Sequence, residues 1–222
     1  MKKTLNIELK AAIFATISPE LMRHGFSLKR AKDRFVRQRD GVTDLFQLVC
    51  LDGKPGYRIQ PHVGVRIEQV ESIFHQTSGF ESRHQKDTPT MGNSIGILQS
   101  GDSRSCEFLL ESESQIALIA EKITDVFCKF ALPYFERWES LIVIDAELNG
   151  KPVERTHQRP LAWQRCSTGL IVAKLVGRPD YSQLSALYTE IMAQDNKGFY
   201  LKRFQALVKS LETVEAGSGL AR

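Results

Sequence analysis

The sequence predicts an α+β protein in which an antiparallel meander sheet of about five or six strands packs on helices and precedes a C-terminal helical subdomain. In residues 57–67 the apolar residues alternate with a period of two, and residues 42–51 are apolar on both faces, as in a strand covered on both sides. Asp40-Gly41, between residues 33–39 and 42–51, is a dipeptide that favours a tight hairpin turn. After Pro133 the apolar residues follow helical spacing.

The N-terminal part of the chain is predicted to be helical. Apolar residues of segment 5–17 share one helical stripe, which indicates a first helix. Ser18 and Pro19 then supply an N-cap and a first-turn proline, so they predict a second short helix that ends at His24-Gly25.

The predicted sheet consists of short segments separated by turn-forming residues. The segments on either side of Asp40-Gly41 form a hairpin, and YRIQPHVGVRI follows as a third strand. An edge strand before this hairpin and a second hairpin after it extend the same sheet. The predicted strands are 26–29, 33–39, 42–51, 57–67, 95–99 and 105–111.

Several helices are predicted after the third strand. Ser112 and Gln115 match a capping box, which predicts a helix that begins there and ends at Pro133. Segment 77–94 is long and polar, as is typical of a functional or mobile loop. The other predicted helices are 68–76, 134–148, 161–176, 181–193 and 199–212.

Composition indicates where the domains divide. The link GKPVERTHQRP is polar and contains glycine and proline, as expected at a boundary. We therefore predict an α+β sheet domain over residues 1–150 and a helical subdomain over 151–214 that packs on it. Residues 215–222 have the composition of a disordered tail.

Length and composition limit the classes of protein. The 222 residues are 42% apolar, which is enough to bury a core. No apolar run approaches the roughly 18 residues of a membrane span. Asn6, Glu8 and Lys10 interrupt what would be the apolar region of a signal peptide. These features predict a cytoplasmic protein that does not bind a membrane.

Neither a cofactor nor a metal is predicted from the cysteines and histidines. The four cysteines are far apart in sequence, which indicates buried free thiols rather than a zinc motif. A weaker alternative is a metal held in the long loop 77–94 together with a histidine that lies shortly before it. The residues that would hold it are His75, Glu81, His84 and Asp87.

The charge distribution is dipolar although the net charge is only +4. The basic segment, residues 23–39, has seven basic residues and one acidic residue, or +6, whereas residues 107–147 have nine acidic and three basic residues, or −6. Phe26 and Phe35 lie among the arginines of the basic segment, as in surfaces that bind phosphates and stack on bases. The acidic helix suits a basic protein partner. Alternatively, the two regions neutralise each other or are solvated faces.

One strand carries a row of hydrogen-bond donors. In YRIQPHVGVRI the second, fourth and sixth residues are polar, the eighth is Gly64, and the tenth is again polar. Alternate residues of a strand share one face, so these polar side chains form a row. Arginine side chains bind carboxylates and phosphates, and a protonated His62 strengthens such a row. We predict an anion-binding surface here, and the alternative is a plain solvent-facing side of the sheet. The predicted binding residues are Arg58, Gln60, His62 and Arg66, with Arg37 and Arg39 beside them.

No catalytic residue is predicted. The sequence has no nucleophile elbow, no phosphate-binding glycine loop, no dinucleotide fingerprint and no helical pair of metal-binding histidines.

The order of elements resembles that of a family. A helix ending in HGF, the hairpin FVRQRDGVTDLFQL, a strand ending in VGVRI, a loop and a long helix follow one another. This order resembles the bacterial domain of unknown function numbered 4304 and related proteins of toxin-immunity and defence loci, over residues 8–145. The resemblance implies a cytoplasmic bacterial α+β domain that binds another protein.

The sequence therefore predicts a non-enzymatic binding protein associated with immunity or defence, which holds a protein partner through its sheet face or acidic helix. The first alternative is a nucleic-acid-binding module that uses the basic segment 23–39. The second alternative is an unrecognised hydrolase or nucleotide-binding enzyme.

Overall fold

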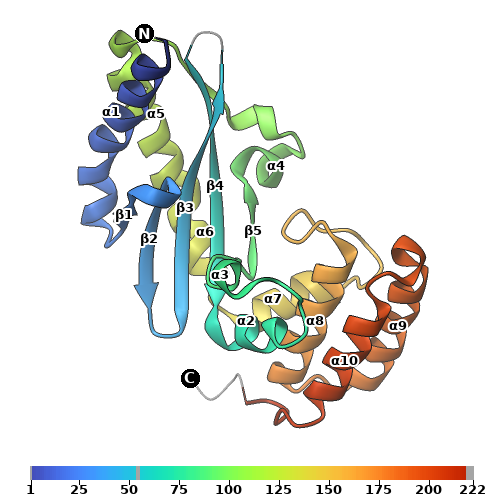
Figure 1. Cartoon of the computed structure of the whole chain (residues 1–222). Coiled ribbons are helices and arrows are strands. Elements are labelled where there is room, and N and C mark those ends of the chain that lie inside the picture. The colour runs from blue at the N-terminus through green and yellow to red at the C-terminus, as the bar shows by residue number, and fades with distance from the viewer. Residues whose placement is uncertain (1, 54–55, 219–222) are drawn as a thin grey trace. The chain divides into compact units, whose positions relative to one another are not determined.

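The computed structural model describes residues 2–53 and 56–218. It consists of a six-stranded antiparallel sheet and helices, so the predicted α+β class is confirmed. The strand order is β1-β2-β3-β4-β5, and β6 also pairs with β4. Figure 1 shows the sheet with its helices. The strands are β1 (Ser27–Lys29), β2 (Arg34–Arg39), β3 (Val42–Asp52), β4 (Tyr57–Ile67), β5 (Met91–Ser94) and β6 (Phe108–Leu110).

The first hairpin confirms the prediction from Asp40-Gly41. Arg39 of β2 lies opposite Val42 of β3, so Asp40 and Gly41 between them form the turn, and Gly41 has a φ of 66°. Glycine adopts this left-handed conformation without steric cost. The edge strand β1 pairs antiparallel with β2, also as predicted.

The second predicted hairpin is wrong. The segment predicted as its first strand is instead α4 (Ile95–Ser100), because Ser94 caps it by accepting a hydrogen bond from the Ile97 backbone N–H at 3.2 Å. Strand β5 precedes this helix, and the chain reaches β6 through the short helical turn η2 (Ser103–Cys106).

Strands β5 and β6 each approach β4 separately. Leu110 of β6 pairs with Tyr57 at the start of β4. In β5, a Cβ atom at Gly92 would lie 2.4 Å from the Val63 carbonyl oxygen, and the φ of Gly92 is 155°. Only glycine permits this close approach.

Helices α1 (Lys2–Arg23) and α5 (Ile116–Val126) cover one face of the sheet (Figure 1). The rings of Phe14 in α1 and Phe35 in β2 stack with centroids 5.8 Å apart. Phe127, just after α5, meets Phe26 and Phe46 edge-on at 5.2 Å each. These rings form the core between helices and sheet.

Two prolines lie within helices that were predicted to break there. Helix α1 continues through Pro19, so the predicted break at Ser18 is absent. Before Pro133 the helix widens into a π-helical turn, η4 (Phe127–Ala131), and continues as α6 (Leu132–Arg137). A proline cannot donate a backbone hydrogen bond, and a π turn is one way in which a helix accommodates that loss.

The capping box before α5 is confirmed. The Gln115 side-chain oxygen accepts hydrogen bonds from the backbone N–H groups of Glu111, at 2.7 Å, and Ser112, at 3.2 Å. The remaining short turns are η1 (Arg30–Lys32), η3 (Glu113–Gln115) and η5 (Asp195–Gly198).

The remaining helices confirm most of the predicted C-terminal pattern. The predicted helix 134–148 is divided into α6 and α7, with the buried Trp138 between them. The helices not yet given bounds are α2 (Glu68–His75) and α3 (Ser82–Gln85), and in the C-terminal part α7 (Leu141–Asn149), α8 (Ala162–Val176), α9 (Tyr181–Gln194) and α10 (Leu201–Leu211).

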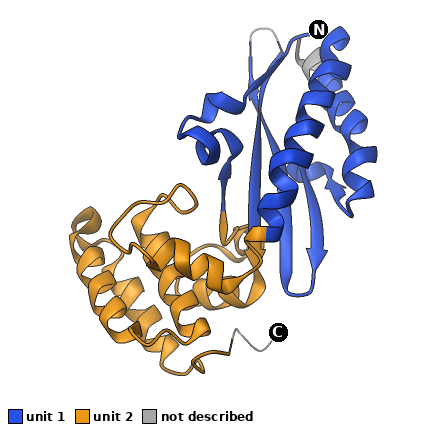
Figure 2. Cartoon of the chain, turned by 180° about the vertical axis from the view of Figure 1, so that it is seen from behind, with its two compact units in different colours: residues 1–65, 92–136 blue, residues 66–91, 137–222 orange. Residues whose placement is uncertain are grey.

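The chain forms two compact units, coloured separately in Figure 2: residues 1–65 with 92–136, and residues 66–91 with 137–222. This division differs from the predicted boundary at residue 150, because α7 packs on α8. The buried Asn149 amide donates to the Gly169 carbonyl at 2.9 Å, and the Tyr188 hydroxyl donates to Asn149 at 2.6 Å.

The predicted tail is partly ordered. The Gly217 backbone N–H donates to the Lys174 carbonyl at 3.1 Å, and the other end of the predicted tail, 219–222, lies outside the described residues. Across residues 2–53 and 56–218, no helix combines the length and the apolar character that crossing a membrane requires.

Candidate functional site

The predicted polar row of β4 faces away from α1. Tyr57 faces α1, so strand alternation directs Arg58 and Gln60 to the other side of the sheet. Arg58 is exposed and lies opposite Leu109 of β6. The Gln60 amide donates to a Glu107 carboxylate oxygen at 2.7 Å. Of Arg58 and Gln60, Arg58 is the charged residue, and its side chain is exposed to solvent.

His62 is half-buried in the same row, and its Nε2 atom has no hydrogen-bond partner among the described residues. Burial lowers the pKa of His62, because a charged imidazole is disfavoured away from water. The lowered pKa therefore disfavours, near neutral pH, the protonated His62 that the sequence predicts.

The His62 environment predicts a pH dependence of stability. As the pH falls through about 6.5, the ordinary histidine value, the unfolded chain gains a proton at His62 that the folded chain does not. The free energy of unfolding should therefore fall between about pH 7.5 and about pH 5, and less in His62→Gln. Chemical denaturation at several pH values measures this. His84→Gln, at an exposed position of α3, is the control. Equal pH slopes in wild type and His62→Gln would contradict the assignment.

Arg66 is used within the fold, although the sequence predicts an exposed binding group. Its side chain is 7% exposed. The guanidinium donates to the carbonyl oxygens of Gln85, at 2.8 Å, and Thr88, at 3.0 Å, and it pairs with Glu68 at 2.9 Å. Glu71 lies 3.7 Å away. Arg66 thus anchors the segment after α3 to the end of β4.

Arg37 and Arg39 do not lie beside the polar row, which corrects their predicted position. They lie on the sheet face covered by helices, where the Arg37 guanidinium is 4.9 Å from the centroid of the Phe26 ring. Both pair with the fully buried Asp44, at 2.7 Å and 2.8 Å. Arg39 also donates to the Phe135 carbonyl at 3.2 Å. Strand pleating separates these arginines from the row on β4.

The basic segment is less suited to base stacking than its sequence indicates. Phe26 and Phe35 are 2% and 0% exposed, so their rings belong to the core and cannot stack on bases. Lys29, Arg30 and Lys32 remain exposed around η1. The exposed basic side chains of this segment therefore include a group at the edge of the sheet, and Arg23 lies apart from it at the end of α1.

The weaker metal alternative in the loop is not supported by the geometry of His75. Its Nδ1 lies 2.9 Å from the Ser78 hydroxyl and its Nε2 lies 2.7 Å from the Thr88 hydroxyl. Both ring nitrogens are therefore engaged. His84 is exposed on α3.

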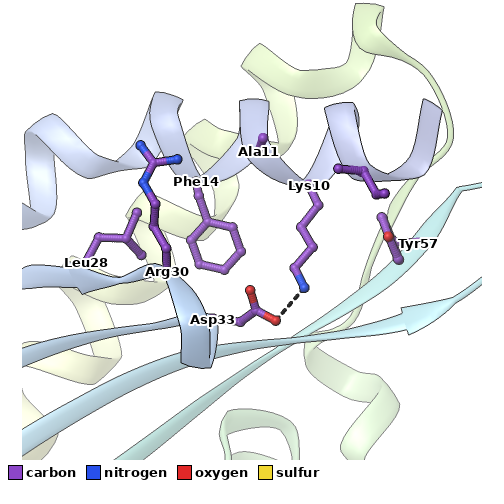
Figure 3. A pocket seen from close by; sticks show the side chains of 8 residues that line it. Lys10, Ala11, Phe14, Leu28, Arg30, Asp33 and Tyr57 are labelled. Carbon is purple, nitrogen blue, oxygen red and sulfur yellow. Dashed lines mark hydrogen bonds and ion pairs between the residues drawn. The ribbon is translucent and has the colours of Figure 1, made fainter. Parts of the chain in front are cut away.

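A cavity of about 310 Å³ lies beside α1, and we call it the α1 pocket. Figure 3 shows that side chains from α1 face side chains from the sheet and η1 across it. The lining residues from α1 follow helical spacing, so they share one face of the helix. The pocket is lined by Ile7, Lys10, Ala11, Phe14, Leu28, Arg30, Asp33 and Tyr57.

The floor of the α1 pocket carries an ion pair between Lys10 and Asp33 (Figure 3). Burial alone would lower the pKa of Lys10, but the hydrogen bond and the charge of Asp33 raise it, so the amine is charged. Asp33 has a φ of 50°, a left-handed conformation that aspartate tolerates better than most residues. This conformation ends η1 where β2 begins.

Two further polar groups lie near this ion pair. Burial raises the pKa of the Tyr57 hydroxyl, and the charge of Asp52 adds to this effect, so the hydroxyl keeps its proton. Burial also raises the pKa of the nearby Cys50 thiol to about 11. Both groups are neutral near pH 7 and act as hydrogen-bonding groups rather than charges.

Arg30 differs from Lys10 because its guanidinium pairs with no acidic residue in the part of the chain that the structure describes. It is exposed, and Figure 3 shows it rising from η1 toward α1 at one side of the pocket. Ile7, which also lines the pocket, is 60% exposed. The pocket therefore combines an available cation with an apolar wall.

The α1 pocket was not predicted from the sequence. Beside the core stripe of α1, the same helical spacing contains a second apolar stripe that lines the pocket, formed by Ile7, Ala11 and Phe14. In comparisons with family models, with curated proteins and with solved structures, no match to this chain was found.

Proposed function

We propose that this protein binds a small organic anion with an apolar body in the α1 pocket. The observation that carries the proposal is the placement of Arg30, exposed and with no acidic partner among the described residues, at the side of a largely apolar cavity of about 310 Å³. Small-molecule sites are typically cavities of about 300–1,000 Å³ with apolar walls and a few polar groups that orient the ligand.

The apolar body of the ligand would lie against α1. Phe14 and Ala11 offer a ring and a small side chain one turn apart, and Leu28 of β1 faces them. Phe14 is held in place by stacking on Phe35. A rigid wall of this kind favours a flat aromatic or branched aliphatic group, because little side-chain entropy is lost on binding.

The anionic group would pair with Arg30. Lys10 is already neutralised by Asp33, so the positive charge that a ligand meets in the pocket comes from Arg30. A guanidinium binds a carboxylate or phosphate through two parallel hydrogen bonds. The Tyr57 hydroxyl provides a further neutral polar group inside the pocket.

This proposal keeps the expectation of a binding protein and specifies a ligand class. The protein partner, the role in immunity or defence and the resemblance to the 4304 family stay predictions. Burial of the two aromatic rings of the basic segment argues against nucleic-acid binding there, because buried rings cannot stack on bases.

Binding of 2-naphthoate, an aromatic carboxylate, tests the proposal by isothermal titration calorimetry. We expect saturable binding by the wild type and no binding of the matching cation, 2-naphthylmethylamine. Arg30→Gln should weaken binding by about tenfold, because one charge-assisted hydrogen-bonded pair is lost. Ala11→Phe should abolish binding, because the new ring fills the pocket.

Each variant has a matched control. Lys29→Gln removes the same charge from the neighbouring exposed position, and Ala15→Phe adds the same ring to an exposed position one turn further along α1. Both controls should bind as the wild type does. Equal losses in Arg30→Gln and Lys29→Gln would reduce the effect to general charge attraction and would overturn the pocket proposal.

A further inference from the structure

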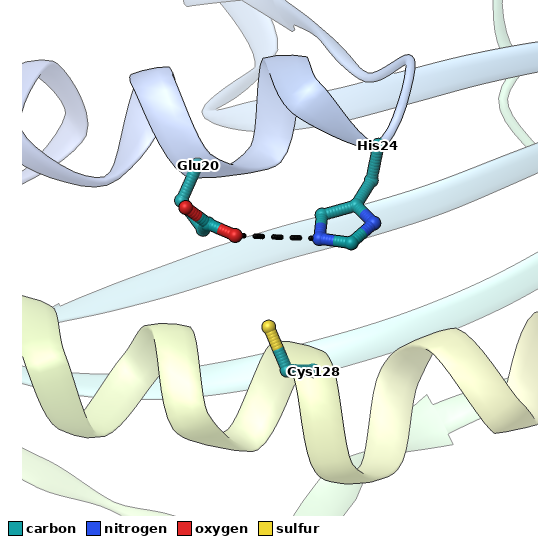
Figure 4. Close-up of side chains that lie close together, drawn as sticks. All are labelled: Glu20, His24 and Cys128. Atoms are coloured by element: carbon teal, nitrogen blue, oxygen red, sulfur yellow. Dashed lines mark ion pairs between the residues drawn. The ribbon is translucent and has the colours of Figure 1, made fainter.

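Three potential metal ligands meet on the opposite end of α1 from the α1 pocket. Glu20 lies in the last turn of α1, and His24 follows directly after the helix ends at Arg23. The two are four residues apart, so their side chains lie on the same side of this end of the helix. Cys128 lies in the π-helical turn η4. Figure 4 shows the three side chains directed into the same space between these two helical segments.

The ligand atoms are close enough for a shared ion. A carboxylate oxygen, an imidazole nitrogen and the Cys128 sulfur all lie within 4.8 Å of one another. The His24 Nε2 atom is 3.4 Å from the Glu20 carboxylate. Ligand atoms of a tetrahedral zinc site are roughly 3.5 Å apart, so side-chain shifts of roughly 1 Å would complete the arrangement.

Other contacts hold these groups in place. The His24 ring meets the ring of Phe127 edge-on, with centroids 5.6 Å apart. The His24 backbone carbonyl accepts a hydrogen bond from Arg37 at 3.4 Å. Cys128 lies within a π-helical turn, a feature that is often found at functional sites.

The three side chains are accessible to solvent, and an ion can displace the residue that now pairs with Glu20. The side chains of Glu20 and His24 are 30% and 35% exposed, so an ion can reach them. Arg23 pairs with Glu20, but the Arg23 side chain is 73% exposed. An exposed ion pair of this kind is weak.

We propose that Glu20, His24 and Cys128 form a zinc-binding site. The donor set of one thiolate, one imidazole and one carboxylate suits zinc, whereas calcium and magnesium prefer oxygen ligands. Three protein ligands leave a fourth position for water or a ligand. The site shares no residue with the α1 pocket, so it is independent of the proposed function.

Cobalt(II) is the probe for this site, because its absorption reports both thiolate ligation and tetrahedral geometry. Titration of the metal-free protein should produce a thiolate-to-cobalt band in the near ultraviolet and tetrahedral bands in the visible, at one equivalent. Zinc should displace the cobalt. Cys128→Ser should remove the near-ultraviolet band, and His24→Gln should weaken binding at least tenfold.

Cys50→Ser is the matched control, because Cys50 is also a free, half-buried cysteine. It should bind cobalt as the wild type does. Glu20→Gln preserves the size of a solvent-accessible side chain and should also weaken binding at least tenfold, so it tests the site even if Cys128→Ser does not fold. Absence of cobalt binding by the wild type, or a near-ultraviolet band that persists in folded Cys128→Ser, would overturn the proposal.

Discussion

Replacing Glu71 by glutamine is expected to lower the free energy of unfolding by about 3–5 kcal/mol, because it removes a buried negative charge that two buried arginines share. Glu71 is fully buried. One carboxylate oxygen accepts a hydrogen bond from Arg159 at 3.2 Å, and the other accepts one from Thr88 at 2.6 Å. Arg66 lies 3.7 Å from it. The amide would remove from both guanidinium groups the negative charge that Glu71 supplies.

The control for this variant is Glu68→Gln, which makes the same chemical change beside the same arginine. Glu68 pairs with Arg66 at 2.9 Å, but its side chain is 64% exposed. Its loss should cost no more than about 1 kcal/mol, because water solvates the remaining charge. Urea denaturation measures both variants. Similar losses in the two would show that Glu71 is not the counter-ion that we describe.

The Glu71 effect should also depend on pH. Burial alone would raise the pKa of Glu71, but Arg159, the hydrogen bonds of His75 and Thr88 and the charge of Arg66 together hold it below its ordinary value. A depressed pKa contributes stability that is complete above the ordinary value of about 4.3 and is lost as the pH falls toward the folded value. The difference between wild type and Glu71→Gln should therefore narrow from about pH 7 to about pH 3.

Replacing Asp44 by asparagine is the second large effect, an expected loss of about 3 kcal/mol. Asp44 is fully buried and pairs with Arg37 and Arg39, whose side chains are 21% and 28% exposed. Its carboxylate holds both guanidinium groups against the hairpin. Because these arginines are partly hydrated, the loss should be at the lower end of the range for buried pairs.

Asp40→Asn is the matched control for Asp44→Asn. Asp40 is exposed at the tip of the same hairpin, and Asn-Gly favours the same turn as Asp-Gly. Thermal unfolding should show a change within about 0.5 kcal/mol for this variant. An Asp44→Asn protein as stable as Asp40→Asn would mean that the two arginines need no anion.

Elements that depend on neighbouring residues were predicted well. The hairpin at Asp40-Gly41 and the capping box of Ser112 and Gln115 are confirmed. In each, the interaction that forms the element is between residues close in sequence, so the local pattern contains the necessary information.

The predicted strand at residues 95–99 shows where local patterns fail. A short apolar run suits a strand or a helix equally, and Ser94 as an N-cap decided the outcome. Local patterns also failed at Pro19 and Pro133, where a helix end was predicted. The helix continues through each proline because packing of the surrounding helix offset the missing backbone hydrogen bonds.

The sequence by itself determined the α+β class, the order of the first four strands and most helix boundaries, because these follow from residue periods and turn chemistry. Only the tertiary structure decided which charged groups are available to a ligand. Glu71 and Arg159 are 88 residues apart in the chain, and their pairing removes both from the surface. Arg30 remains available because the fold brings it no acidic partner among the described residues, and its apolar neighbours come from α1 and β1. Charges find their counter-ions through space, whereas periods and turns are properties of the adjacent chain.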